Sequence, residues 1–245
     1  MGSDWSWTLA LPDGTLNAAT VERLLALVET FGLSPHRPGG GINGFDNSRG
    51  HEGEHRVLAW EQLVHSLSTG SWSTNLWTRS EEEEEEVFVT TRPGGANGWD
   101  LVTLSLDAVH CRRTPTAQAE PFRELHRILT ELWMAIATET GALFGRVEDE
   151  WSLEQIWSEL PDPFLGVTPP PLGSWPDWLS WVTYFDADRY RLLSPVLGQL
   201  GADVRRTRHE AAVVVLLTDP GAVDPVRFAR LHHEYRRAVR TSLPS

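Results

Sequence analysis

A near-continuous apolar run close to the C-terminal end, AAVVVLLT at Ala211–Thr218, is the sequence feature that most constrains the fold. A strand with one face in water alternates apolar and polar residues, whereas a run without alternation predicts a strand buried on both faces. We therefore expect Ala211–Leu217 to be a central strand of a sheet. Such a strand needs neighbours on both sides, so the rest of the chain must supply them.

Several other segments follow the periods of strands and helices. Alternating residues predict strands at 3–11, 87–91, 100–108, 143–148 and 178–185. Apolar residues at helical spacing predict helices at 17–31, 57–68 (with a strand and turn as the alternative), 119–140, 152–160, 186–193, from Ser194-Pro195, and from Asp224 onward. This order predicts an α+β fold, a mostly antiparallel sheet with helices packed on one side. Two similar halves are conceivable, although no internal repeat is visible.

The length and the cysteine count limit the organisation of the chain. A chain of 245 residues and 27.5 kDa suits one large domain or two small ones. We expect a single α+β domain over residues 1–245, with flexible loops near 34–56 and 78–86 and a proline-rich crossover at 161–176. One cysteine excludes an intramolecular disulfide. No apolar run is long enough to span a bilayer and no signal peptide is evident, so we expect a cytoplasmic protein without a membrane partner.

The charged residues exclude some functions. The chain has 34 acidic and 21 basic residues, all of the latter arginine, for a formal net charge of −13. Without lysine there is neither Schiff-base chemistry nor an intact Walker A loop. The negative charge argues against nucleic-acid binding and is compatible with a basic protein partner.

Six consecutive carboxylates form the sharpest electrostatic feature. A run of like charges repels itself, so it should be exposed, and it can meet arginine or lysine on a partner. Two tryptophans lie in the polar segment just before it, and tryptophan is enriched at interfaces. We expect a partner-binding surface made of Trp72, Trp77, Glu81, Glu82, Glu83, Glu84, Glu85 and Glu86. The alternative is a solvated loop without a function.

The segment HEGEH contains the one recognisable catalytic pattern. His51 and His55 match the two zinc ligands of an H-E-x-x-H helix, and Glu52 matches its general base. The context is poor, because the segment follows a glycine-rich stretch and Gly53 disfavours a helix. The third ligand is undefined, with His65 as the nearest option. A zinc-dependent hydrolase is therefore the alternative function, and the preferred interpretation has no catalytic residue, metal or cofactor.

The C-terminal third has a sequence rhythm similar to that of a known family. It is carried by WLSWVTYF at 178–185, DADRY at 186–190, LGADV at 200–204, the strand 211–217, Thr218-Asp219-Pro220 and the closing helix from Asp224. This pattern resembles the bacterial polymorphic-toxin immunity proteins, nearest to immunity protein family 52. The N-terminal strand and helix, and a mid-chain helix such as 119–140, are similar in layout.

The resemblance implies an α+β, single-domain, cytosolic protein that inhibits a toxin encoded beside it, and it transfers no site residue. We expect an immunity protein that binds and neutralises a cognate bacterial toxin, for which a nuclease is one candidate. A third interpretation is an α+β scaffold with a small-molecule pocket.

Overall fold

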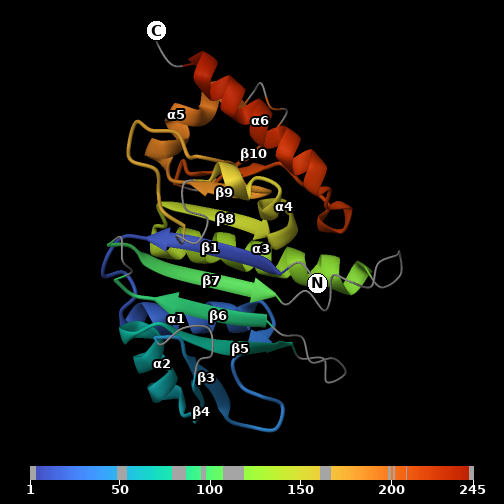
Figure 1. Ribbon diagram of the computed structural model, residues 1–245. Helices are drawn as coiled ribbons and strands as arrows, with labels where there is room; N and C mark the ends of the chain where they lie inside the picture. Colours follow the sequence, from blue (N-terminus) through green and yellow to red (C-terminus); the bar gives the residue numbers. More distant parts are fainter. Residues whose placement is uncertain are drawn as a thin grey trace.

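The computed structural model describes residues 4–48, 54–78, 87–94, 98–106, 119–160, 167–197, 200, 202–207 and 209–242. Their strands form one 11-stranded sheet in the order β10-β11-β9-β8-β1-β7-β6-β5-β3-β4, with β2 paired to β5 (Figure 1). All of the described strand pairs are antiparallel. The predicted α+β fold with a mostly antiparallel sheet is confirmed.

The elements have the following bounds. The strands are β1 Trp5–Leu11, β2 Leu33–Ser34, β3 Ile42–Asp46, β4 Glu54–Leu58, β5 Trp72–Thr78, β6 Val87–Arg92, β7 Asp100–Leu106, β8 Phe144–Asp149, β9 Val182–Phe185, β10 Asp203–Arg206 and β11 Ala212–Val215. The α-helices are α1 Ala18–Thr30, α2 Trp60–Thr69, α3 Ala119–Thr140, α4 Glu150–Glu154, α5 Ala187–Leu197 and α6 Pro225–Ser242, and 3-10 turns lie at Trp157–Glu159 and Pro220–Ala222.

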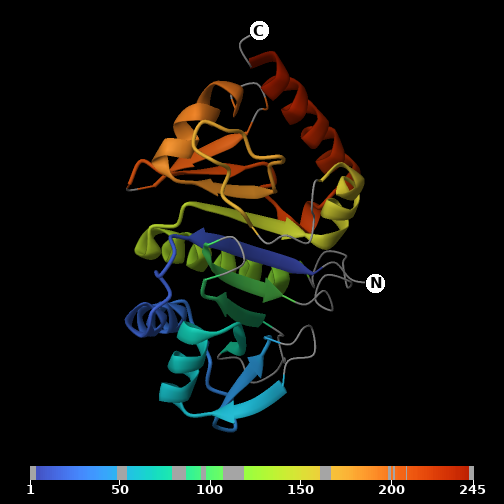
Figure 2. The same ribbon diagram turned by 60° about the vertical axis from the view of Figure 1, so that its left-hand side comes forward.

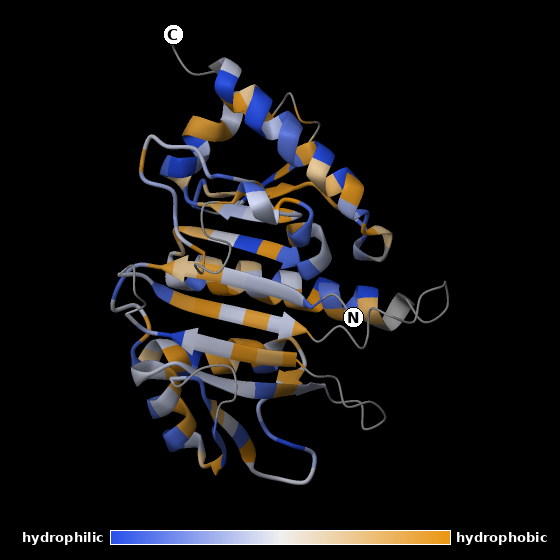
Figure 3. Cartoon of the chain, viewed as in Figure 1, coloured by the Kyte–Doolittle hydropathy of each residue, from blue (hydrophilic) through white to orange (hydrophobic). Residues whose placement is uncertain are grey.

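The first three helices pack on one face of the sheet and enclose the larger core. Trp5, Trp7 and Leu9 of β1 point into it and contact the apolar side of α3. The N-terminus of α1 is fixed by Asn17, whose side chain accepts a hydrogen bond from the backbone N–H of Thr20 at 3.1 Å. Figure 3 shows hydrophobic and hydrophilic residues alternating along α3 and α6, as expected for helices with one buried side.

Helix α5 departs from the expected one-sided arrangement, because it packs on the opposite face of the sheet. There, Phe144, Phe185 and Val214 of three adjacent strands form a second core cluster with Tyr190 of α5 and Tyr235 of α6. Strands β9 and β11 are buried on both faces, so both faces of the sheet require a cover there. Figure 2 shows α5 and α6 at the end of the sheet formed by the last strands.

The apolar run near the C-terminal end forms β11, which pairs with β10 on one side and β9 on the other. All four of its residues are buried. The strand is therefore internal and buried on both faces, but it is not central as predicted, because it is the second from the end of the sheet. Strand β1 holds the middle of the sheet, between β7 and β8.

The structure corrects the expected bounds of four segments. Residues 34–56 contain β3 and the start of β4, and residues 72–78 form β5, where sequence patterning predicted no strand. α5 runs without a break through Pro195, where a new helix was expected to start. The alternation at 178–185 becomes a strand only from Val182 onward. In the described part of the proline-rich crossover, residues 167–171 have no helix or strand.

No helix in the described part of the chain is long and apolar enough to cross a membrane.

Candidate functional site

One face of the sheet, opposite to α1, α2 and α3, is formed mainly by polar and aromatic side chains of six adjacent strands. Figure 1 looks onto these strands, with α1 and α3 behind them. Because successive side chains of a strand point to opposite faces, the pairing register identifies the members of this surface. We call it the open face, and its residues are Ser6, Thr8, Asn43, Phe45, His55, Val57, Ser73, Asn75, Trp77, Phe88, Thr90, Arg92, Thr103 and Ser105.

Hydroxyl and amide groups of the open face bind one another across the strands. The hydroxyls of Ser73 and Thr90 lie 2.7 Å apart, and those of Thr8 and Thr103 lie 3.1 Å apart. Asn43 donates from Nδ2 to Asn75 Oδ1 at 3.1 Å. These cross-strand bonds fix the side-chain rotamers, so the polar groups are held in place before any ligand arrives.

Aromatic rings lie beside this polar network. The ring centroids of Phe45 and Phe88 are 5.9 Å apart, and His55 lies 5.3 Å from Phe45. Trp77 also belongs to this face, and its buried indole nitrogen has no hydrogen-bond partner among the described residues. Among the members of the open face, Arg92 is the one permanently charged side chain, so this surface is not acidic.

The two tryptophans of the predicted acidic and aromatic partner surface lie on opposite faces of the sheet. Strand β5 places Trp77 on the open face, whereas Trp72 points to the helix side and packs against the core. The guanidinium carbon of Arg56 lies 5.9 Å from the Trp72 ring on that side. Glu81–Glu86 lie outside the described residues. The two tryptophans therefore lie on opposite faces of β5, because their positions on the strand differ by an odd number of residues, and their role in binding a partner stays a prediction.

The predicted zinc motif does not have the setting that its chemistry requires. His55 lies on strand β4, not on a helix, and His51 and Glu52 lie outside the described residues. Because Asn43 donates from its nitrogen to Asn75, its oxygen accepts from His55 Nε2, 3.1 Å away, and this occupies one ring nitrogen. His65 lies on α2, which packs on the other face of the sheet. Among the described residues, no cluster of three His, Cys, Asp or Glu side chains could hold a metal ion.

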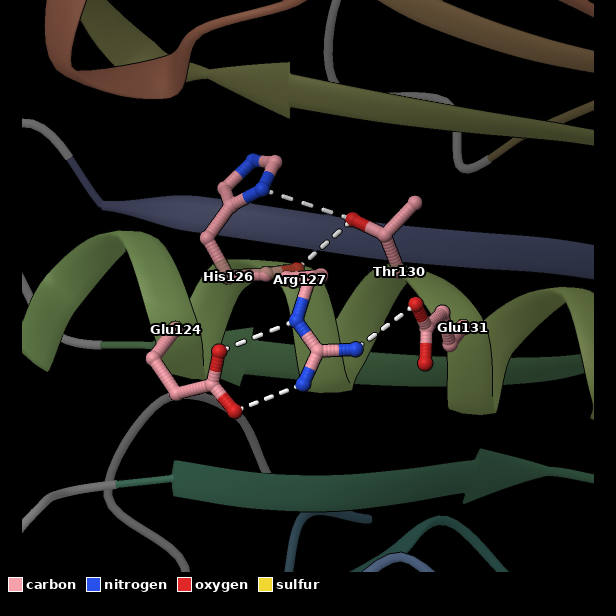
Figure 4. Close-up of polar contacts among 5 residues, drawn as sticks. All are labelled: Glu124, His126, Arg127, Thr130 and Glu131. Atoms are coloured by element: carbon pink, nitrogen blue, oxygen red, sulfur yellow. Dashed lines mark hydrogen bonds and ion pairs between the residues drawn. The ribbon is translucent and has the colours of Figure 1, made fainter.

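Helix α3 carries a network of charged and polar residues that Figure 4 draws. On its solvent side, Arg127 donates two hydrogen bonds to Glu124, at 2.6 and 2.9 Å, and one to Glu131, at 2.8 Å. The hydrogen bond from Arg127 lowers the pKa of Glu124. On the sheet side, Thr130 donates to the backbone carbonyl of His126 at 2.8 Å, and its hydroxyl lies 3.4 Å from the ring nitrogen Nδ1 of His126.

His126 is enclosed by aromatic rings. Its ring centroid lies 4.6 Å from Trp5, 4.9 Å from Trp7 and 5.9 Å from Phe122. Burial lowers the pKa of His126 to about 3, against a smaller opposing effect of Asp219. The imidazole is therefore neutral at physiological pH and serves the packing of β1 against α3.

A second group of polar residues that sequence reasoning missed lies beside the open face, on β8. Arg146 and Glu148 point to the same side of the sheet as the open face, and Trp178 covers them. Glu148 Oε1 accepts hydrogen bonds from Trp178 Nε1 at 2.8 Å and from Ser180 Oγ at 2.5 Å. In the sequence, this group is marked only by Arg146 inside the otherwise apolar strand LFGRV. The residues that bind Glu148 lie about thirty residues further along the chain, so the sequence does not show the group.

The chain was compared with family models, curated proteins and solved structures. No family model matches the chain, and a search of curated proteins gives no match. Among solved structures, the chain is similar to the Pseudomonas aeruginosa T6SS protein PA0821, with a TM-score of 0.49 and 12% identity over 96% of this chain and 73% of that one. No residue role is carried over from it, and membership of immunity protein family 52 stays a prediction.

Proposed function

We propose that this chain is an immunity protein, which binds and neutralises a cognate bacterial toxin in the cytosol and acts by occlusion, not by catalysis. The observation that carries the proposal is the open face, a continuous surface of six strands on which polar side chains are already bonded to one another. Surfaces that recognise proteins combine adaptable Ser and Asn side chains with rigid aromatic rings, and the open face has this composition.

The internal hydrogen bonds of the open face support binding at a low entropic cost. A side chain that is free in solution loses rotamer entropy when a partner fixes it, at about 0.5–1.5 kcal/mol for each rotamer-rich group. Ser73, Thr90, Thr8 and Thr103 are already paired before binding. The net charge of −13 supports attraction to a basic toxin, and the six glutamates would supply this steering.

The test is protection of cells from a toxin. The toxin domain encoded beside this gene is expressed with the wild type, with Thr103→Arg, or with Val226→Arg. Thr103 is half-exposed in the middle of the open face, whereas Val226 is 74% exposed on α6. We expect the wild type and Val226→Arg to restore growth, and Thr103→Arg to fail while keeping its thermal unfolding temperature.

Two results would count against the proposal. If the wild type gives no protection and no complex with the neighbouring toxin, the immunity function is wrong. If Thr103→Arg protects as well as the wild type, the immunity function stands but the open face is not the contact surface.

A further inference from the structure

Among the described residues, two arginines are buried on the same side of the sheet, and their guanidinium groups differ in their hydrogen bonding. Arg189 of α5 donates from Nε to the carbonyl of Pro170 at 2.8 Å and from Nη1 to Asp186. Arg146 of β8 is buried to the same degree, with 6% of its surface exposed against 8% for Arg189. However, its Nε atom is buried without a hydrogen-bond partner among the described residues.

The neighbouring carboxylate does not satisfy Arg146. Arg146 Nη1 lies 3.7 Å from Glu148 Oε1, which is beyond hydrogen-bond length. The same oxygen already accepts from Trp178 Nε1 and Ser180 Oγ, which hold the carboxylate in its position. Glu148 therefore supplies a counter-charge to Arg146 without using its N–H donors.

Stacking fixes the plane of the guanidinium, in which the buried Nε–H has no partner among the described residues. The Arg146 Cζ atom lies 3.5 Å from the Trp178 ring centroid and 5.2 Å from that of Phe144. A stacked guanidinium uses its faces for the aromatic rings, so its in-plane N–H groups stay available for an acceptor. Burial lowers the pKa of Arg146, but a guanidinium remains charged, so the buried donors cost free energy until an acceptor arrives.

We propose that the guanidinium edge of Arg146 binds a carboxylate group, with Trp178 as the platform that orients it. A carboxylate presents two coplanar oxygens and matches the arginine fork. Glu148 and Asp177 both act on the Arg146 guanidinium electrostatically, and this negative surrounding favours a monoanion over a phosphate dianion. Thr8 lies opposite Arg146 in the register of β1 and β8, and its hydrogen bond with Thr103 leaves one hydroxyl proton of that pair free to donate.

The carboxylate can come from a small organic acid or from an aspartate or glutamate side chain of a polypeptide. Both sources present the same planar oxyanion, and the site lies at the border of the open face. The inference does not depend on the immunity function, because it starts from the unpaired Nε–H of Arg146 alone.

The experiment follows the Nε–Hε signal of Arg146 by NMR in the full chain. The signal is assigned by its loss in Arg146→Lys, and the protein is titrated with sodium acetate up to about 100 mM, a range that detects weak binding. Sodium chloride at matched ionic strength is the control titration. Arg205, whose side chain is 58% exposed, gives an internal control signal in the same spectrum.

We expect a saturable shift of the Arg146 signal with acetate, no shift with chloride, and a change at Arg205 no larger than chloride produces. The blocked peptide acetyl-Gly-Glu-Gly-amide distinguishes the sources: tighter binding than acetate assigns the site to a polypeptide side chain, and weaker binding assigns it to a small acid. In Arg146→Lys, the acetate-induced shift of the Trp178 indole signal should need about tenfold more acetate, because an ammonium cannot form the bidentate pair.

Two outcomes overturn the proposal. One is the absence of a saturable shift with both acetate and the peptide. The other is an equal response to sodium sulfate, which would show a general anion effect and not recognition of a planar carboxylate.

Discussion

Trp133 lies so close to Gly145 that a Cβ atom on the glycine would be 2.7 Å from Cζ2 of the indole. Leu9 and the backbone oxygen of Thr8 crowd the same position, at 2.6 and 2.9 Å. Gly145→Ala should therefore destabilise the protein by about 1–3 kcal/mol, since an overpacked core must shift its side chains or backbone. Denaturant unfolding measures the loss. Gly39→Ala is the control, because nothing lies within 4 Å of a Cβ at that position.

His126 should make the protein less stable in mild acid. Its pKa of about 3 is below that of the unfolded chain, so the unfolded state binds the extra proton as the pH falls through 6.5. The stability is therefore fully present above pH 6.5 and is lost between pH 6.5 and 3. Between pH 7 and pH 5 the loss from this residue is about 2 kcal/mol.

Urea unfolding of the wild type and of His126→Phe at both pH values measures this loss. The variant should lose about 2 kcal/mol less than the wild type between pH 7 and pH 5. His232, whose pKa is also lowered by burial, contributes equally to both proteins and cancels from the comparison. Identical pH dependence in the two proteins would mean that His126 is hydrated in solution.

The two tryptophans of β5 should act on different properties. Trp77→Ala should weaken toxin binding by about 2 kcal/mol or more, mainly through faster dissociation, because an aromatic anchor is lost. Trp72→Ala should lower the stability and leave the dissociation rate unchanged, since Trp72 packs on the helix side. Surface plasmon resonance and thermal unfolding on both variants separate the effects. The reverse pattern would place the contact surface on the helix side.

The acidic run should affect the rate of association with a basic toxin. Changing Glu81–Glu86 to glutamine should lower the association rate more than it raises the dissociation rate, because rim charges steer an encounter. The effect should fade as salt shortens the screening length to about 10 Å at 0.1 M. Stopped-flow mixing at two salt concentrations tests this. Equal association rates without salt dependence would leave the run as a solvated loop. Glu22, Glu29 and Glu61, exposed on α1 and α2, are the control positions.

Purified protein should contain no stoichiometric zinc. The reason is local: His55 lies on a strand and donates from Nε2 to Asn43. Elemental analysis of the wild type, His55→Ala and His65→Ala measures the metal content. One zinc per chain in the wild type and in His65→Ala, lost in His55→Ala, would restore the zinc-dependent hydrolase as the leading function.

The sequence predicted those elements whose burial follows a simple period. Helix α3 has the predicted bounds, and β6 and β7 lie within about two residues of the predicted strands. Strands β3 and β5 were missed because Gly, Asn, Ser and Thr occupy positions that are usually apolar in a half-buried strand. These residues are stable there because they hydrogen-bond across the open face, as Ser73 does with Thr90. Pairs of this kind depend on strand register, which a single sequence does not reveal.

The candidate site was less predictable for the same reason. Trp72 and Trp77 are neighbours in the sequence, but only the pairing of β5 shows that they face opposite sides. Arg146 of β8 and Trp178, which follows the proline-rich segment in the sequence, come into contact only in the folded chain. Composition predicted a protein-binding role without identifying Arg146 or Trp178.

Strand β1 lies in the middle of the sheet, and its contacts are with residues far along the chain. Thr8 pairs with Thr103, 95 residues later, and its backbone oxygen accepts a hydrogen bond from Trp133, 125 residues later. Contacts of such separation require large loops to close, which slows folding. During synthesis, β1 cannot pair until β7 and β8 have been made. Until then Trp5 and Trp7 are not buried in the core.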